Sequence, residues 1–205
     1  MTTALLVLAG YLAGSMPFGY WVVRLVRHVD IRTVGSGNIG ASNVFRTFGP
    51  RLGLLVALLD TAKGFAPALL AALVAGPLAG VLAGAAAMLG HWRPLFLGLA
   101  RGGKMVATCG GALLGVAPLV GFLAVAVWLG LFLVTRYASL GSVGAALGLP
   151  VIAFLLSEPW PVVVFTATAG LFVIVLHRSN LARLRAGTES RFEFRRARKG
   201  AAART

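Results

Sequence analysis

The chain has 205 residues, of which 59% are hydrophobic and 12% charged, with a formal net charge of +14. A mean hydropathy of +0.90 excludes an ordinary soluble domain, and long continuous apolar runs favour membrane helices over the alternating segments of a transmembrane β-barrel. The basic residues follow the ends of apolar runs, which membrane topology explains and nucleic-acid binding does not. The composition therefore predicts an all-α integral membrane protein that binds no nucleic acid.

The first apolar run covers residues 4–26 and predicts a membrane helix that Pro17 should kink. A glycine-rich segment follows at 35–43. Its glycines suit a concave nest of backbone N–H groups that binds an anion, and neutral polar side chains and one arginine accompany them. We interpret this segment as a phosphate-binding loop at the membrane surface, in preference to an ordinary polar connection. Its residues are Gly35, Ser36, Gly37, Asn38, Gly40, Ser42, Asn43 and, three positions on, Arg46.

Residues 52–74 and 78–89 predict the second and third membrane helices, joined by a tight turn at 76–77. The second helix contains Asp60 and Lys63, which share one helix face and should pair inside the bundle. A helix-positioning ion pair and a direct contact of Lys63 with substrate are equally compatible with this pattern.

The remaining apolar runs predict four more helices. Residues 105–135 are longer than one crossing requires, so we expect a break near Gly115 and Pro118 and two short spans. Residues 143–156 and 162–176 predict the last two. Seven spans put the Lys- and Arg-rich segments on one side, which the positive-inside rule makes the cytoplasm. We therefore expect seven transmembrane helices, several of them short, with the N-terminus outside and the C-terminus in the cytoplasm.

These helices form one predicted membrane domain over residues 1–189, and residues 190–205 predict a basic, disordered cytoplasmic tail. Three polar stretches, at 91–108, 136–142 and 177–189, fall on the same predicted face as the glycine-rich loop. Each combines a cation with small hydroxyl or amide groups. Together they predict one site recessed at the cytoplasmic interface, among interrupted helices.

Other chemistries fit the sequence less well. The glycine spacing at 35–40 matches a dinucleotide fingerprint, but no strand precedes it. The segment 98–104 resembles a P-loop, but Met105 stands where Ser or Thr is needed. Paired carboxylates and metal-ligand clusters are absent from the sequence pattern. We therefore predict neither a metal nor a cofactor.

The polar stretches resemble the bacterial membrane acyltransferases that use acyl phosphate to acylate glycerol 3-phosphate, the PlsY family. The matching signatures are Gly-Ser-Gly-Asn-Ile-Gly-Ala-Ser-Asn-Val-Phe-Arg at 35–46, the His…Pro…Phe…Gly-Gly-Lys…Val-Ala-Thr pattern at 91–108, and His-Arg-Ser-Asn…Arg-Leu…Gly-Thr-Glu at 177–189. The resemblance extends to about residue 189. The sequence departs from the family at Ser42, Arg101 and Met105, where Thr, Lys and Gly are usual.

This resemblance implies a membrane enzyme that converts glycerol 3-phosphate and acyl phosphate into lysophosphatidic acid and phosphate. It implies a multi-pass protein of the bacterial cytoplasmic membrane with its site facing the cytoplasm, in contact with membrane lipid, and we expect a monomer. The catalytic candidates are Ser36, Arg46, Lys104 and His177. The candidates for binding substrate or phosphate are Gly35, Gly37, Asn38, Gly40, Ser42, Asn43, Lys63, His91, Arg101, Gly102, Gly103, Thr108, Ser139, Ser142, Asn180 and Glu189.

Two phosphorylated substrates repel each other, which explains the number of cations. We hypothesise that the glycine-rich loop, Arg46 and Lys104 hold phosphate, that His177 and Asn180 orient glycerol 3-phosphate, and that the acyl chain lies between helices. A substrate phosphate then accepts the proton, with His177 as base the alternative. A CoA-dependent acyltransferase is disfavoured, because its His followed five residues later by Asp is missing. An organic-phosphate transporter is the alternative from another class of protein.

Overall fold

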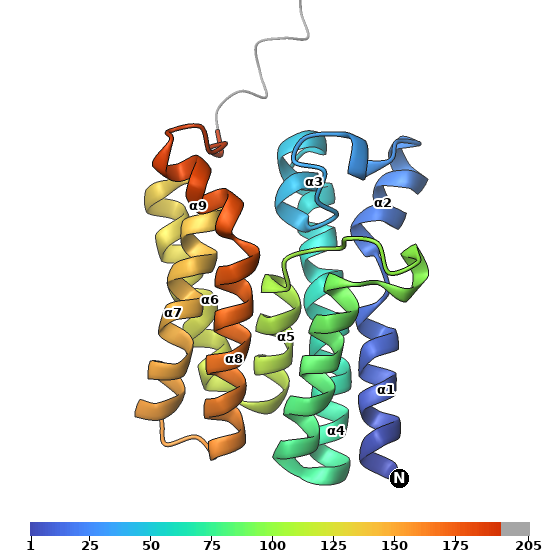
Figure 1. The fold of residues 1–205 in the computed structure, drawn as a ribbon, viewed down its shortest axis with the longest axis vertical. Coiled ribbons are helices and arrows are strands. Elements are labelled where there is room, and N and C mark those ends of the chain that lie inside the picture. Colours follow the sequence, from blue (N-terminus) through green and yellow to red (C-terminus); the bar gives the residue numbers. More distant parts are fainter. Residues whose placement is uncertain (194–205) are drawn as a thin grey trace, which may run out of the picture.

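The computed structural model describes residues 1–193, and every regular element in that range is helical (Figure 1). Figure 1 shows a bundle of roughly parallel helices, with short helices and loops gathered at one end. The elements are α1 (Thr2–Gly14), α2 (Phe18–Arg27), η1 (Ile31–Thr33), α3 (Ala41–Phe48), α4 (Pro50–Trp92), η2 (Leu95–Leu97), α5 (Val106–Val116), α6 (Pro118–Thr135), α7 (Ala138–Leu155), α8 (Trp160–Leu176) and α9 (Arg178–Arg185).

Helices α1 and α2 follow one another with the predicted break before Pro17, whose nitrogen cannot donate a helical hydrogen bond. Small residues let α1 lie against α4. A Cβ built on Gly14 would come within 2.0 Å of the Ala87 carbonyl oxygen, and one on Gly10 within 2.4 Å of the Ala83 oxygen. The backbones therefore touch directly, as small-residue contacts between membrane helices allow.

Helix α4 is a hairpin of two antiparallel arms rather than one rod. Its backbone leaves the helical region at Ala75 and Gly76, and Gly76 has a φ of 84°. A Cβ on Gly80 would lie 2.8 Å from the Ala72 Cβ, which is possible only if the chain turns back on itself. Figure 1 shows the two arms running in opposite directions. The predicted turn at 76–77 is confirmed.

The predicted division of residues 105–135 near Gly115 and Pro118 is also confirmed. Helix α5 continues through Gly115 to Val116, and the break falls at Ala117, immediately before Pro118. Gly115 instead lets α5 pack closely on α4, because a Cβ there would lie 2.9 Å from the Phe65 carbonyl oxygen. Helix α5 is therefore short, and it lines one side of the cavity described below.

Helices α3 and α9 were not expected from the sequence, where their residues read as loops. Each has only eight residues, too few for the apolar periodicity of a helix to stand out. Helix α7 likewise begins at Ala138, before its predicted start at Val143. All three corrections place helical backbone within the predicted polar stretches, so side chains there are held more firmly than a loop would hold them.

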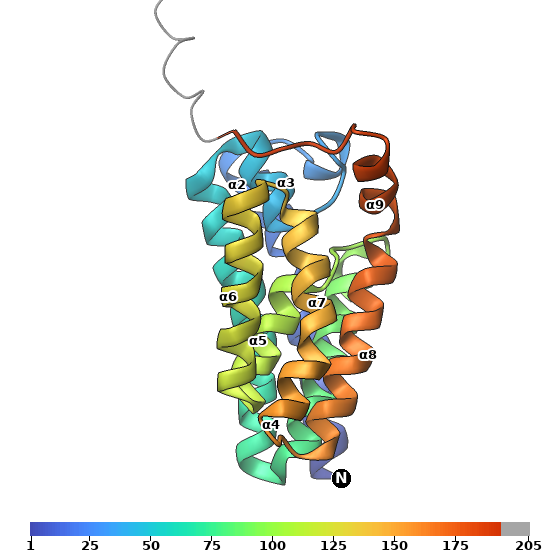
Figure 2. The same ribbon diagram turned by 90° about the vertical axis from the view of Figure 1, so that its left-hand side faces the viewer.

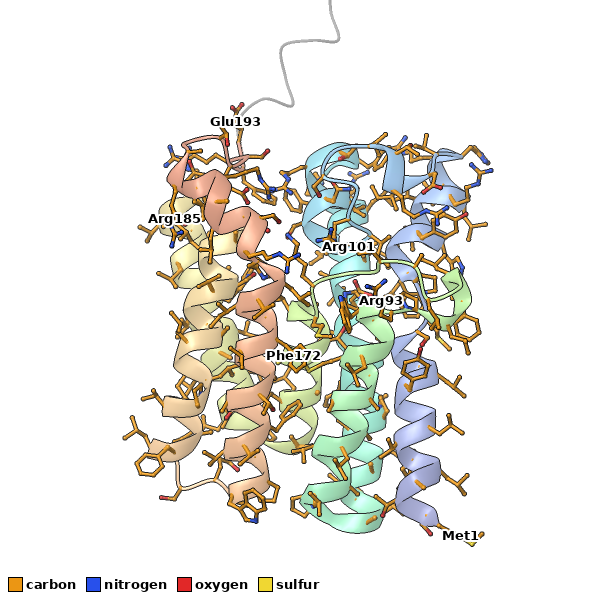
Figure 3. The ribbon with its side chains drawn as sticks, in the orientation of Figure 1. Met1, Arg93, Arg101, Phe172, Arg185 and Glu193 are labelled. Carbon is orange, nitrogen blue, oxygen red and sulfur yellow. The ribbon has the colours of Figure 1, made fainter. Side chains whose placement is uncertain are left out.

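The polar stretches share one end of the bundle, as predicted. Figure 1 shows α2, α3 and α9 at that end and the N-terminus at the other. In Figure 3, nitrogen- and oxygen-bearing side chains crowd the end labelled by Arg93, Arg101, Arg185 and Glu193, whereas carbon dominates toward Met1.

Four helical segments in the described chain are long and apolar enough to cross a membrane, or five if α8 and α9, which meet at 53°, form one broken span. The structure thus has the apolar helices of an integral membrane protein.

Candidate functional site

A cavity of about 470 Å³ opens between the helices beneath the polar end. Its polar part is lined by α3, the loop before α5, the end of α8 and α9. Its apolar part continues along α5, α6 and α7, where Leu113, Val125 and Leu149 form the wall. It therefore joins a polar mouth to an apolar limb. The predicted site residues that line it are Ser36, Asn38, Gly40, Ser42, Asn43, Arg46, His91, Lys104, Ser139, Ser142, His177, Asn180 and Glu189.

The glycine-rich loop is held by its own asparagines. Asn43 Oδ1 accepts the Ser36 N–H at 2.9 Å, and Asn43 Nδ2 donates to the backbone oxygens of Val34 and Asn38 at 3.1 and 2.9 Å. Asn38 Oδ1 accepts the Gly40 N–H at 2.8 Å. Acceptors within the loop and its flanks thus already occupy three of its N–H groups, those of Ser36, Gly37 and Gly40, and the expected nest stays a prediction for the others.

Gly35 and Gly37 are required by the shape of this loop. Their φ values are 60° and 69°, in the left-handed region that favours glycine. A Cβ on Gly35 would also lie 2.3 Å from Asn43 Oδ1. Neither glycine is among the residues that line the cavity. Their observed role is to let the chain pass around Asn43.

The second polar stretch is fixed to the first and to α4. Asn38 Nδ2 donates to the Gly102 oxygen at 3.2 Å, and the Gly103 N–H donates to the His91 oxygen at 3.0 Å. A Cβ on Gly103 would fall 1.9 Å from the His91 ring, so the backbone lies flat on the imidazole. These contacts set the position from which Lys104 enters the cavity.

Met105 ends this loop with a φ of 68°, an unusual value for a residue with a side chain. The resemblance made Gly usual here, and the left-handed backbone supplies the physical reason. The Met105 side chain is 1% exposed and packs with Leu113 and Met88 in the main core cluster. Burial thus offsets the backbone strain.

A series of side-chain hydrogen bonds crosses the mouth of the cavity. Lys104 Nζ donates to Asn180 Oδ1, Asn180 Nδ2 donates to Glu189 Oε1 at 2.6 Å, and Arg183 Nε donates to Glu189 Oε2 at 2.7 Å. Burial raises the pKa of Glu189, but hydrogen bonds from Asn180 and Arg183 outweigh it and leave the pKa below its usual value. The carboxylate is therefore ionised and holds the Asn180 amide in one orientation.

The cations at this mouth are partly desolvated and close to one another. Burial, followed by the charge of Arg183, lowers the pKa of Lys104 to about 8. Burial also lowers the pKa of Arg46, which stays charged at any working pH. No hydrogen bond or ion pair to another described residue occupies the Arg46 guanidinium; only the ring of Phe192 lies against it, 5.2 Å away. Its donors are thus available to an anion.

His177 is buried at the junction of α8 and α9. Its Nδ1 lies 2.7 Å from the Val173 oxygen, which assigns the proton to Nδ1 and leaves the lone pair on Nε2. Burial lowers the pKa of this imidazole to about 4. His177 is therefore neutral at physiological pH and presents a hydrogen-bond acceptor.

The predicted pair in α4 forms at the edge of the cavity. Lys63 Nζ lies 2.8 Å from Asp60 Oδ1 and donates to the Met16 oxygen at 2.8 Å, next to the α1–α2 break. Its cation faces the Phe18 ring at 5.6 Å. Asp60 lines the cavity but Lys63 does not. The lysine thus ties α4 to the Met16 carbonyl at the break between α1 and α2.

Four other predicted residues lie outside the cavity lining: Arg101, Gly102, Gly103 and Thr108. Arg101 is exposed, and Thr108 is fully buried where its backbone touches Gly64 of α4. Ser142 lines the wall, donates to the Ala138 oxygen at 2.8 Å and accepts Trp128 Nε1 at 3.1 Å. Sequence reasoning missed an aromatic group at the mouth, made of Phe45, Trp128, Phe132 and Phe192.

Phe192 also bears on the predicted tail. It belongs to residues 190–205, yet it is only 5% exposed and lines the cavity. The boundary at residue 189 therefore cuts through the candidate site, and residues 194–205 lie outside the described structure. Within residues 1–193, no group of three or more His, Cys, Asp or Glu side chains could hold a metal ion.

Comparisons with known proteins agree on one family. The family profile described as "Glycerol-3-phosphate acyltransferase" matches residues 4–187. Relatives with that name include one from a Synechococcus strain, 46% identical over 93% of this chain and 96% of its own length, and one from Aquifex aeolicus, 43% identical over 94% and 100%.

Two solved structures of PlsY, described as an integral membrane glycerol 3-phosphate acyltransferase, resemble the fold. Its glycerol 3-phosphate form has a TM-score of 0.90 and 41% identity, and its lysophosphatidic acid form 0.87 and 39%. Each match covers 94% of this chain and 96% of the solved one.

Proposed function

Because this chain belongs to the glycerol-3-phosphate acyltransferase family, we propose that it transfers an acyl group from acyl phosphate to the 1-hydroxyl of glycerol 3-phosphate, giving lysophosphatidic acid and phosphate. One observation carries the proposal for this chain. Arg46, Lys104 and the free Nε2 of His177 meet at a polar mouth that continues into an apolar limb. Such a cavity suits a reaction between a phosphorylated polar molecule and a phosphorylated acyl chain.

The cations neutralise the two phosphates. The Arg46 donors are unoccupied, and Lys104 has further N–H groups beyond the one given to Asn180. The first turns of α3 and α5 have no side-chain cap and also border the cavity, so their N–H groups add partial positive charge. Ser36 is exposed at the mouth and offers a hydroxyl to phosphate.

The reaction needs little more than position and charge stabilisation. The 1-hydroxyl oxygen of glycerol 3-phosphate attacks the carbonyl carbon of acyl phosphate, the bond from that carbon to the phosphate oxygen breaks, and the electrons leave with phosphate. Arg46 and Lys104 stabilise the negative charge that develops on the leaving group. The hydroxyl proton passes to a substrate phosphate, whose second pKa is about 6.

His177 orients the hydroxyl in this scheme. With Nδ1–H engaged by Val173, Nε2 accepts a hydrogen bond from the attacking hydroxyl. An imidazole whose pKa is about 4 is a poor general base at neutral pH. This supports the substrate phosphate as proton acceptor over His177.

The remaining predicted residues act as supports in this proposal. Glu189 orients the Asn180 amide, which accepts a hydrogen bond from Lys104, while Asn38, Asn43 and His91 shape the two loops. Neighbouring residues contribute to the same shape: Gly35, Gly37, Gly40, Ser42, Gly102, Gly103, Thr108, Ser139 and Ser142. We assign Lys63 a structural role and leave Arg101 as an exposed cation that draws anions to the mouth.

Purified protein in detergent tests the activity. Mixed with acyl phosphate and glycerol 3-phosphate, it should form lysophosphatidic acid and release an equal amount of phosphate, and each should require both substrates. A transporter for organic phosphates would release none. Phosphate release without lysophosphatidic acid would indicate simple hydrolysis and contradict the proposed transfer.

We further propose seven spans in the bacterial cytoplasmic membrane, with the site facing the cytoplasm and the protein working as a monomer. The α4 hairpin supplies two crossings, and one chain lines the whole cavity. With Cys109 replaced by Ala, Ser157→Cys should react with an impermeant thiol reagent from outside the cell. Ala186→Cys should react only after permeabilisation. The reverse pattern would overturn the orientation.

A further inference from the structure

Residues 187–193 form a strap across the mouth of the cavity. The chain leaves α9, turns at Gly187, whose φ is 69°, and crosses toward the end of α6 (Figure 2). There the Phe192 N–H donates to the Arg136 oxygen at 2.9 Å, and Arg191 Nε donates to the Thr135 oxygen at 3.2 Å. The strap is thus anchored on the side of the mouth opposite α9.

The strap delivers one aromatic side chain into the cavity wall. The Phe192 ring lies 5.2 Å from that of Phe45 and 5.0 Å from that of Phe132, both edge to face. Phe132 in turn stacks on Trp128 at 5.0 Å. This group joins α3, α6 and the strap in one buried cluster that also includes Ala138 of α7, so the Phe192 ring has little freedom to move.

The Arg46 guanidinium lies over the same ring, with its central carbon 5.2 Å from the ring centre. A guanidinium over an aromatic face is attracted by the ring quadrupole, and its donors remain free at its edges. No other described residue fixes these donors by a hydrogen bond or ion pair. The ring therefore limits where the cation sits without using the groups that bind an anion.

We propose that Phe192 is a positioning residue for Arg46, which it holds in place for phosphate through its ring face, and that the strap makes the C-terminal segment part of the site. The inference rests on the phosphate-binding role proposed above for Arg46. Phe192 lies beyond the 4–187 range of the family match, and that match does not assign it.

Removal of the ring at nearly constant bulk tests this role. Phe192→Leu should lower kcat/KM about 3–30-fold, the range expected from losing a partly desolvated cation–π contact. In an Arg46→Gln background, which has no cation for the ring to hold, the same substitution should cost less than about twofold. Phe172→Leu, at a half-exposed ring of α8, is the matched control and should behave as the wild type.

A second series keeps the fold intact. Phenylalanine at 192 is replaced by analogues with one, two and three ring fluorines, which weaken the quadrupole at almost constant shape. The loss in kcat/KM should grow with fluorine number in the wild-type background and vanish with Arg46→Gln, which carries no charge.

These experiments distinguish a positioning role of Phe192 from simple packing, and both from failure of the proposed function. Equal losses in both backgrounds, or a flat fluorine series, would overturn the positioning role and leave Phe192 as packing. Wild-type protein that forms no lysophosphatidic acid would instead contradict the proposed function itself.

Discussion

Two polar groups lie in this apolar bundle, and they differ in what they leave free. The Asp60–Lys63 pair is closed, because Lys63 is bound to Asp60 and the Met16 oxygen and faces the Phe18 ring, and both side chains are at most 3% exposed. At the mouth, and among the described residues 1–193, no acceptor bonds Arg46, only Asn180 accepts from Lys104, and His177 keeps Nε2 free. Buried charge that is fully paired holds helices together, whereas charge that is held in position but left unpaired can bind a substrate.

Lys63→Met should cause the largest loss of folding stability, since it leaves the Asp60 carboxylate buried without its partner. Breaking a buried pair in this way costs about 3–5 kcal/mol. We expect the midpoint of heat unfolding in detergent to fall sharply, and Asp60→Asn combined with Lys63→Met to recover most of it. If the double variant is stable but has a much higher KM for a phosphorylated substrate, Lys63 contacts substrate and the comparison fails.

Arg46→Ala and Lys104→Ala should instead lower the rate strongly and leave the stability of the fold nearly unchanged. Removal of one group that stabilises developing charge typically costs about 10²–10³-fold in rate, and two phosphates in one site make the loss at least that large. The unfolding midpoint should stay close to that of the wild type, because neither cation is closed by an ion pair. Turnover close to normal in either variant would show that this cation does not take part in binding or reaction of the substrates.

The apolar runs and the one-sided distribution of cations were enough to predict the long apolar helices, the turn at 76–77 and a break near Pro118, but not the short helices α3 and α9. The chemistry of the glycine-rich loop was harder. An asparagine that accepts the loop's N–H groups and one that binds substrate look alike in a sequence, and only the path of the chain around Asn43 distinguishes them.

Phe192 was missed for a different physical reason. It lies in a basic segment of low hydropathy, where one aromatic residue carries no periodic signal. Its partners Phe45, Trp128 and Phe132 come from distant parts of the chain, so the group exists only after folding. Two phenylalanines, Phe192 and Phe194, just beyond a conspicuous polar motif were the available hint.

The pH dependence gives a finer distinction at the mouth. Lys104, with a pKa of about 8, is protonated below that pH and loses its charge as the pH rises through it. The kcat/KM should therefore decline above about pH 8, since this parameter reports the free enzyme. Lys104→Arg keeps the charge and should lack the alkaline decline even if its rate is lower. A decline at the same pH in that variant would assign it to another group.

Met105→Gly should have the smallest effect. It relieves a strained backbone, worth about 1–3 kcal/mol, but removes a buried side chain whose loss costs about 2–5 kcal/mol. The net result should be a modest fall in the unfolding midpoint. An increase would show that strain outweighs packing at this position.

The protein supplies charge and position rather than a strong base, and His177→Gln tests this most directly. Glutamine can keep a hydrogen bond to the substrate hydroxyl, so kcat should fall less than about tenfold, with the larger change in the KM for glycerol 3-phosphate. The acidic limb of the pH–rate profile, near the phosphate pKa of about 6, should survive. A fall in kcat of about 10²–10⁴-fold together with loss of that limb would contradict this and identify His177 as the base.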